Sequence, residues 1–217
     1  MADAPILTSP EHLRSALDAG AFVDGGPVRL LDVRWRLDRP DGRPDYRAGH
    51  IPGALYVDLD RELAGHGAPT DGRHPLPSVA ALQDAVRRWG VSADDTVVVY
   101  DDLKNMSSAR AWWLLRHAGL RDVRLLDGAL DAWTGAGFAL ETGDAAPPAP
   151  GTATLEYGAT PVLQLDAVAD FAADSVLLDA RAADRYRGEV EPIDPRAGHV
   201  PGAVSASTSR MRSMSSP

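Results

Sequence analysis

Residues 96–100 read Thr-Val-Val-Val-Tyr, and each of them is β-branched or aromatic. Residues of these types favour β-strands, and a short continuous apolar run is typical of a strand that is buried on both faces of a sheet. The segments Val28–Val33, Ala54–Leu59 and Val123–Leu126 have a similar apolar character. The sequence therefore predicts a sheet of several short, buried strands.

Helical segments alternate with these strands along the chain. The first begins at Ser9-Pro10-Glu11, where a capping hydroxyl, a proline and an acid suit the first turn of a helix. Further helices are predicted over residues 78–89, 107–117 and 128–134. This alternation indicates an α/β domain with a mostly parallel sheet and helices on both faces. Ligands of such sheets bind beyond the carboxyl ends of the strands, which here points to the loop Asp101–Met106.

One strand motif occurs twice in the chain. Residues 30–34 read Leu-Leu-Asp-Val-Arg, and residues 177–181 read Leu-Leu-Asp-Ala-Arg. The two aspartates of these motifs, Asp32 and Asp179, are 147 positions apart.

A loop motif is also duplicated, in the same order. Residues 47–54 read Arg-Ala-Gly-His-Ile-Pro-Gly-Ala, and residues 196–203 differ from them only by Val for Ile. The histidines His50 and His199 are 149 positions apart, so a two-residue insertion in the connecting loop accounts for the change of offset. Two motifs at nearly one offset predict an internal duplication.

The repeat predicts how the chain is divided. We expect one complete domain at residues 1–143, a Pro-rich linker at 144–159, an incomplete second copy at 160–204, and a disordered Ser-rich tail at 205–217. Within the second copy, residues 165–171 are predicted to be helical and residues 176–178 to form a strand. Because 14 residues follow Ala203 and none of them matches residues 96–100, we expect a C-terminally truncated chain.

Composition limits the function. The chain contains no cysteine, so it has no disulfide, no cysteine–zinc site and no thiolate nucleophile. Its formal net charge of −9 argues against nucleic acid as a partner. We see neither an apolar run that could span a membrane nor a secretory signal, and we expect a cytoplasmic protein. The oligomeric state is not indicated by the sequence.

The motifs together resemble the rhodanese family, in particular its tandem-domain thiosulfate and 3-mercaptopyruvate sulfurtransferases. Besides the two duplicated motifs, the likeness rests on Leu126–Trp133, which reads Leu-Asp-Gly-Ala-Leu-Asp-Ala-Trp, and on the turn Tyr100-Asp101-Asp102 that leads to Ala109–Trp113. The resemblance covers roughly residues 8–204. It implies a rhodanese-like α/β fold.

The resemblance also implies a chemistry. In this family a cysteine thiolate on the loop after the central strand takes a sulfane sulfur from a small anionic donor, becomes a persulfide, and passes the sulfur to cyanide or another thiophilic acceptor. Backbone N–H groups of that loop stabilise the anion. In tandem members the active cysteine lies in the second domain and the first domain carries an aspartate at the corresponding place. In this chain that aspartate is Asp101.

The resemblance implies a substrate-binding role for Arg185, and Arg181 is the second candidate, because a guanidinium binds an anionic donor bidentately. No metal or other cofactor is implied. Since the catalytic cysteine is absent, the sequence supplies no catalytic residue, and we expect this chain to be inactive.

Other interpretations of these residues remain open. Arg185 could be an ordinary solvated loop arginine. His50 and His199 are expected to brace their loops, and Asp32 and Asp179 are expected to accept hydrogen bonds that fix the strand ends.

Two further classes of function remain open. The chain could be a non-enzymatic module that binds an anion or a protein, or a hydrolase that uses Asp101 and Asp102 as paired acids or metal ligands. His66 and His74 lack the spacing of zinc ligands, so no metal site is expected.

Overall fold

A computed structural model describes residues 4–68, 71–192 and 196–207 of the chain. The chain divides into two compact units, Met1–Pro161 and Val162–Pro217. Each unit is described by itself.

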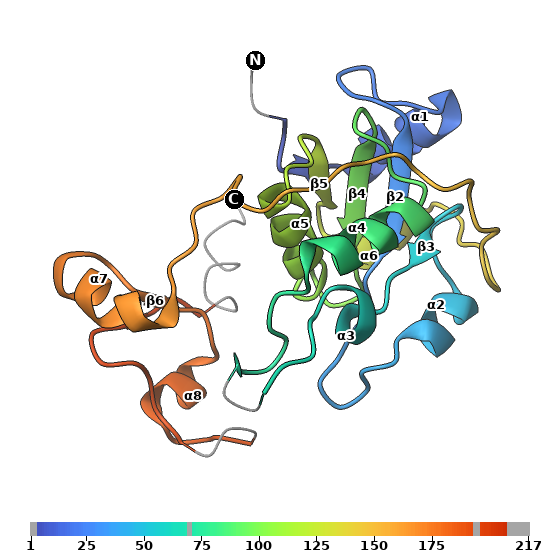
Figure 1. Cartoon of the computed structure of the whole chain (residues 1–217). Coiled ribbons are helices and arrows are strands. Elements are labelled where there is room, and N and C mark those ends of the chain that lie inside the picture. The colour runs from blue at the N-terminus through green and yellow to red at the C-terminus, as the bar shows by residue number, and fades with distance from the viewer. Residues whose placement is uncertain (1–3, 69–70, 193–195, 208–217) are drawn as a thin grey trace. The chain divides into compact units, whose positions relative to one another are not determined.

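The first unit is built on a five-stranded sheet whose strand order is β1-β5-β4-β2-β3 (Figure 1). The strands are β1 (Leu7–Thr8), β2 (Val28–Asp32), β3 (Leu55–Tyr56), β4 (Thr96–Tyr100) and β5 (Val123–Leu126). All four pairings are parallel. The central pair runs in register from Val28 opposite Thr96 to Asp32 opposite Tyr100, so the carboxyl ends of β2 and β4 lie side by side.

Helices cover both faces of this sheet (Figure 1). The helices α4 (Val79–Arg88) and α5 (Ser108–His117) pack on one face, and α1 (Pro10–Ala19) and α6 (Ala129–Gly135) pack on the other. Two shorter helices, α2 (Arg43–Ala48) and α3 (Leu59–Glu62), flank the edge strand β3 in sequence. The prediction of an α/β fold with a mostly parallel sheet is confirmed.

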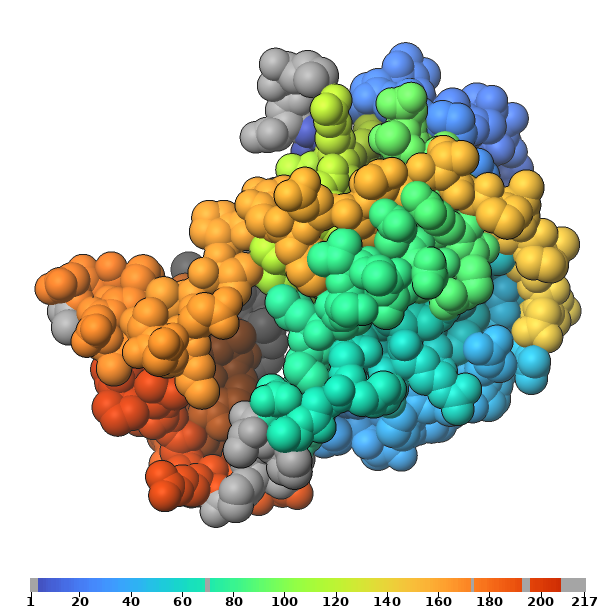
Figure 2. Space-filling model, viewed as in Figure 1, coloured from blue at the N-terminus to red at the C-terminus, as the bar shows by residue number. Residues whose placement is uncertain are grey.

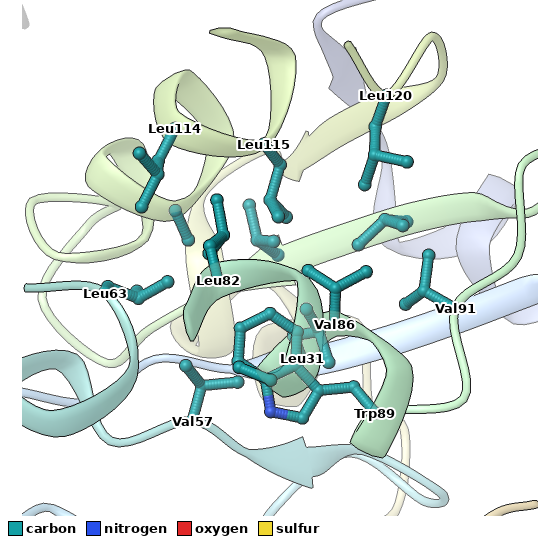
Figure 3. Close-up of a cluster of buried hydrophobic side chains, with 14 of the residues drawn as sticks. Leu31, Val57, Leu63, Leu82, Val86, Trp89, Val91, Leu114, Leu115 and Leu120 are labelled. Atoms are coloured by element: carbon teal, nitrogen blue, oxygen red, sulfur yellow. The ribbon is translucent and has the colours of Figure 1, made fainter. Parts of the chain in front are cut away.

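Side chains from alternate positions of the strands build the two halves of the core. Leu31 and Val99 belong to the cluster under α4 and α5, whereas Leu30 and Val98 belong to the cluster under α1 and α6. Successive residues of a strand point to opposite faces, which explains why these strands are unbroken apolar runs. Figure 3 shows the first cluster, in which Leu82 and Val86 of α4 lie close to Leu31. Each such side chain contributes about 1.5–3 kcal/mol on burial.

Some elements differ from the sequence prediction. The strand expected over residues 54–59 is limited to β3, because the Asp58 carboxylate accepts a hydrogen bond from Arg61 N and starts α3. The helix α2 lies between β2 and β3, where no helix was predicted, and β1 was not predicted either. Both are short, and short elements carry too few residues for a periodic pattern to emerge.

Residues 144–159, expected to be a linker, pack against the first unit. Ala153 and Leu155 are buried in its core, Ala153 N donates to Val91 O, and the Tyr157 hydroxyl donates to Pro77 O. Figure 2 shows this segment as a continuous yellow and orange band of atoms over the green and teal surface of the unit. The segment therefore continues the first unit, which extends to Pro161.

The second unit repeats a small part of the first, the parallel strand pair β2–β3. It contains η2 (Leu165–Ala167), α7 (Val168–Asp174), β6 (Leu178–Asp179), α8 (Ala183–Arg187) and β7 (Val204–Ser205). The parallel pair β6–β7 joins Leu178 to Val204 as β2–β3 joins Leu31 to Leu55. Among the described residues of this unit, the sheet has only these two strands.

The expected disordered tail begins inside this sheet. Ser205 belongs to β7, and Ala206 N donates to Asp179 O at 2.8 Å. Residues 208–217 of the tail lie outside the described residues.

The helices of the described segments are at most ten residues long. None of them could traverse the apolar part of a bilayer.

Candidate functional site

The loop after β4 encloses the carboxylate of Asp101. Its oxygen Oδ1 accepts hydrogen bonds from the backbone N–H groups of Leu103 (2.8 Å) and Asn105 (2.7 Å). Its oxygen Oδ2 accepts from Ser107 N (2.8 Å), Ser108 N (3.0 Å) and the Ser108 hydroxyl (3.2 Å). Asp101 is fully buried. Five donors therefore converge on one carboxylate at the start of α5, where the helix dipole also favours an anion.

Two consecutive left-handed residues shape this loop. Lys104 and Asn105 have φ values of 56° and 64°, a conformation that costs most residues about 1–2 kcal/mol but that glycine and asparagine adopt more readily. The Asn105 side chain fixes the turn, because its Nδ2 donates to Leu126 O at 2.7 Å. The one hydrogen of the Ser108 hydroxyl is shared between Asn105 Oδ1 at 2.9 Å and Asp101 Oδ2 at 3.2 Å. Successive N–H groups then point inward, as in anion-binding backbone nests.

The geometry leaves Asp101 little capacity for acid–base work. A carboxylate offers about four lone-pair sites, and five donors already use them. Its neighbour Asp102 points elsewhere, with Oδ2 at 3.0 Å from Arg36 Nη2. Among the described residues, no three potential ligand side chains are grouped so that they could hold a metal ion.

A cavity of about 480 Å³ lies beside this loop. Its walls include apolar side chains, two cations and one carboxylate, among them those of Trp35, Leu59, Met106, Arg36, Arg110 and Asp38. The Arg110 guanidinium donates to three backbone carbonyls, those of Leu63, His74 and Pro75. Burial lowers the pKa of Arg110. The cavity thus combines apolar walls with the partly buried cation Arg110, and this part of it suits a small anion with an apolar part.

A histidine that no sequence motif singles out also lines this cavity. The Nε2 atom of His74 lies 2.8 Å from Asp60 Oδ1, and the Trp35 indole donates to Asp60 Oδ2 at 3.1 Å. The three residues are far apart in sequence, so no local pattern could have joined them. His66 is not part of this group.

Beneath the loop, an ion pair joins the end of β2 to the duplicated loop motif. Arg34 binds Asp32 through Nε (3.0 Å) and Nη2 (2.8 Å), and Nη2 also donates to Gly49 O at 2.5 Å. Both side chains of the pair are buried. Burial raises the pKa of Asp32 to about 6, although Arg34 and the Tyr100 hydroxyl lower it.

The second unit contains the same set of contacts. Arg181 binds Asp179 through Nε (3.0 Å) and Nη2 (2.7 Å), and Nη2 donates to Gly198 O at 2.6 Å. In this unit the pair is partly exposed, and the hydrogen bonds from Arg181 lower the pKa of Asp179. Because Arg181 makes the same contacts as Arg34, the geometry favours a structural role for it. The guanidinium of Arg185 lies against a carboxylate of the same unit, with Nη2 2.7 Å from Glu191 Oε1.

The histidines brace their loops as predicted. The His50 ring stacks on Tyr46 with centroids 4.0 Å apart, and its Nδ1 lies 2.9 Å from Tyr46 O. The His199 ring stacks on Tyr186 at 3.8 Å, with Nδ1 at 2.8 Å from Tyr186 O. Neither ring contacts Asp101 in any of these interactions.

The model of the rhodanese-like domain matches residues 9–136 of the chain, which include β2, β4 and the Asp101 loop. The chain belongs to the rhodanese family. Its sequence is 50% identical over 188 residues to SseB of Mycobacterium tuberculosis, whose name is that of a thiosulfate sulfurtransferase; the match covers 86% of this chain and 66% of SseB. It is 35% identical over 221 residues to human 3-mercaptopyruvate sulfurtransferase, covering 91% of this chain and 70% of the human protein.

The solved structures agree with this membership. The crystal structure of SseA from Escherichia coli, described as having the rhodanese fold, superposes with a TM-score of 0.79 at 29% identity. The match covers 94% of this chain and 75% of SseA. This rhodanese chain thus spans about two thirds to three quarters of the length of these relatives.

Proposed function

We propose that this chain supplies the non-catalytic rhodanese-like domain and the donor-recognition side of a thiosulfate or 3-mercaptopyruvate sulfurtransferase, and that its 217 residues do not form a persulfide themselves. The observation that carries the proposal is Asp101, whose carboxylate fills the anion-binding loop after β4. In the family this loop carries the sulfur nucleophile in the active domain. No cysteine is present to replace it.

Bond counting supports this interpretation of Asp101. A carboxylate oxygen of aspartate is three bonds from Cα, through Cβ and Cγ. The terminal sulfur of a cysteine persulfide is also three bonds from Cα, through Cβ and Sγ. The Asp101 carboxylate therefore lies where a persulfide anion would be stabilised, but carbon and oxygen cannot accept or release sulfane sulfur.

We further propose that residues 1–143 and 160–204 descend from one duplicated domain, with 144–159 between them. The matching contacts of Asp32–Arg34–Gly49 and Asp179–Arg181–Gly198 support this. The described part of the second copy has counterparts of β2 and β3 but none of β4. It accordingly offers no second nucleophile loop in the described residues.

A thiosulfate–cyanide assay tests the absence of activity. In the family reaction a thiolate attacks the outer sulfur of thiosulfate, the S–S bond breaks and releases sulfite, and cyanide then removes the sulfur as thiocyanate. The full chain is expected to produce thiocyanate no faster than buffer alone. Turnover by the unmodified chain would contradict the proposal.

A second candidate function is that of a binding module for small anions. The observation in its favour is the cavity lined by Arg36 and Arg110 beside the loop. Titration of sulfite into the labelled full chain should then shift the NMR signals of residues around Arg110, and unmoved signals would reject a site in this cavity. The hydrolase alternative gains no support, because the oxygens of Asp101 are already saturated by five donors.

A further inference from the structure

A second cavity of the first unit, the β3 groove, lies at the edge strand of the sheet. Its volume is about 480 Å³, and it shares no lining residue with the cavity beside the Asp101 loop. The side chains that line it come from α2, β3, α3 and α4, which Figure 1 shows at this edge of the sheet, and from residues 144–148. A cavity of this volume suits a small organic ligand.

The Pro-rich segment that was expected to be a linker forms one wall of the β3 groove. The lining residues of this wall are Asp144, Ala145, Pro147 and Pro148. Ala145 N donates to the Tyr46 hydroxyl at 3.1 Å. Pro148 approaches Gly90 so closely that a Cβ atom on Gly90 would lie 2.8 Å from Pro148 Cγ. The wall is therefore held on the folded unit by a hydrogen bond and by close packing.

Arg43 presents an oriented cation to the groove. Its guanidinium lies over the Tyr56 ring, 4.5 Å from the centroid. The ring is itself fixed, because the Tyr56 hydroxyl accepts a hydrogen bond from Gly42 N at 3.1 Å. Within the described ranges, no oxygen accepts a hydrogen bond from the Arg43 guanidinium. A guanidinium that is stacked on an aromatic ring keeps its in-plane N–H groups for a planar carboxylate.

Trp89 supplies a second donor. It is only 4% exposed, and a buried indole N–H usually has a hydrogen-bond partner. The indole N–H groups of Trp35, Trp112 and Trp133 each donate to an oxygen of the chain. That of Trp89 has no such partner in the part of the chain that the structure describes, and its nitrogen is not enclosed. Because Trp89 lines the β3 groove, an acceptor that enters the groove can bind this N–H group.

The carboxylates of the groove favour a ligand with a single negative charge. Each of the three carboxylates that line it lies beside an arginine, in the pairs Asp144–Arg47, Glu62–Arg88 and Asp58–Arg61. Arg43 is the lining arginine that has no carboxylate partner among the described residues. Three nearby carboxylates repel a dianion more strongly than a monoanion. The groove therefore matches a monocarboxylate with an apolar body better than it matches phosphate or sulfate.

We propose that the β3 groove binds a small aromatic monocarboxylate, whose carboxylate accepts hydrogen bonds from Arg43 and Trp89 and whose ring packs along the prolines of residues 147–148. The site is separate from the Asp101 loop. The inference goes beyond the proposed function and does not depend on sulfur chemistry.

The test is a titration of 3-phenylpropionate into the full chain, followed by the indole N–H signals of its five tryptophans in NMR spectra. The Trp89 signal, assigned by its loss in Trp89→Phe, should shift until the site is saturated. The signal of Trp35, which lines the cavity beside the Asp101 loop, should not move. The neutral 3-phenylpropan-1-ol has the same ring and chain length, and it should bind about tenfold more weakly because it lacks the charge.

Two variants test the role of Arg43. Arg43→Gln should weaken the binding of 3-phenylpropionate about tenfold, because it removes the charged donor. Arg61→Gln is the matched control, since it removes the same charge from the same groove, but the Arg61 side chain is 82% exposed and lies beside Asp58. It should change the affinity by no more than about twofold. Unchanged signals of Trp112 and Trp133 would verify that both variants keep the fold.

Each outcome supports or overturns the proposal. If 3-phenylpropionate at millimolar concentration leaves the Trp89 signal unmoved, or moves only that of Trp35, the β3 groove is not its site and the proposal is refuted. If the alcohol binds as tightly as the acid, or if Arg61→Gln weakens binding as much as Arg43→Gln, the groove does not recognise a carboxylate through Arg43 and the ligand class is wrong. None of these results bears on the persulfide proposal, because the test does not involve Asp101.

Discussion

The motifs around Asp32 and Asp179 make the same hydrogen bonds in very different surroundings. In each, an arginine two positions later binds the aspartate with two nitrogens and donates to the glycine carbonyl before the motif histidine. The first ion pair is buried, whereas the second is partly exposed. The pKa of Asp32 is raised by burial and that of Asp179 is lowered by hydrogen bonding. The motif therefore forms the same hydrogen bonds in both units, whereas burial by the rest of the unit determines the direction in which the pKa of its aspartate is shifted.

The largest expected effect comes from breaking one pair at a time. Arg34→Ala leaves the Asp32 carboxyl buried without its cation, and the free energy of unfolding of the first unit should fall by about 3–5 kcal/mol. Urea unfolding followed by tryptophan fluorescence measures this directly, because all five tryptophans precede residue 162. Arg181→Ala is the matched control, with an expected loss in the second unit of about 1 kcal/mol or less, measured by NMR-detected urea titration. Equal losses would show that burial does not distinguish the pairs.

A smaller effect tests how β4 contributes to the first pair. The Tyr100 hydroxyl accepts a hydrogen bond from Ile51 N at 3.0 Å and donates to Asp32. Tyr100→Phe leaves both partners without it and should destabilise the first unit by about 1–3 kcal/mol. The same variant should also raise the pKa of Asp32 further, as measured by the carboxyl carbon shift. An unchanged carboxyl titration would show that Tyr100 does not stabilise the Asp32 carboxylate.

The two aspartates should impose opposite pH dependences on stability. Since the folded pKa of Asp32 is about 6 and the unfolded value is about 3.9, the folded state retains a proton between these pH values that the unfolded state has lost. Stability of the first unit should therefore fall as pH rises from about 4 to 6, by up to about 3 kcal/mol. The Asp32→Asn variant should lack this slope in urea titrations at several pH values.

Asp179 supplies the reverse case. Its lowered pKa means that the folded state of the second unit favours the carboxylate, so its stabilisation is present above about pH 3.9 and is lost as pH falls through the folded pKa. Carboxyl carbon shifts in NMR should place the Asp179 titration below that of Asp32. The reverse order of the two midpoints would contradict the opposite effects of burial on Asp32 and of hydrogen bonding on Asp179.

The smallest expected difference concerns the histidines. Because Nδ1 of His50 and of His199 faces a backbone carbonyl at 2.9 and 2.8 Å, both neutral rings should carry their proton on Nδ1. Nitrogen chemical shifts of the two rings report the tautomer. A proton on Nε2 in only one of them would show that the second loop does not keep the geometry of the first.

The sequence predicts the regular part of the fold because unbroken apolar runs determine it. Residues 96–100 and 123–126 form strands with the predicted ends, since their β-branched and apolar side chains suit a buried sheet. The match of Tyr46 to Tyr186 could not be predicted, because four positions lead from Tyr46 to His50 but thirteen lead from Tyr186 to His199. The stacking of each tyrosine on its motif histidine reveals the match.

The candidate site was predictable in place but not in detail. Asp101 follows the strongest strand, so its position at the carboxyl end of the sheet could be expected. Its five donors depend on left-handed backbone at Lys104 and Asn105. Asparagine adopts this conformation more readily than most residues, but nothing in the lysine indicates it. The contact of His74 with Asp60 arises from a loop whose path the sequence does not specify.

The central claim is that the loop after β4 is an intact anion-binding loop whose nucleophile position is held by Asp101. Asp101→Cys tests it most directly: after incubation of the variant with thiosulfate, its intact mass is measured for the gain of one sulfur atom. Asp102→Cys is the control, because it places a thiol on the adjacent residue outside the ring of five donors. We predict a persulfide, removable by cyanide, on the Asp101→Cys chain and little or none on the Asp102→Cys chain. A folded Asp101→Cys chain that gains no sulfur, or an equal gain in both variants, would contradict the claim.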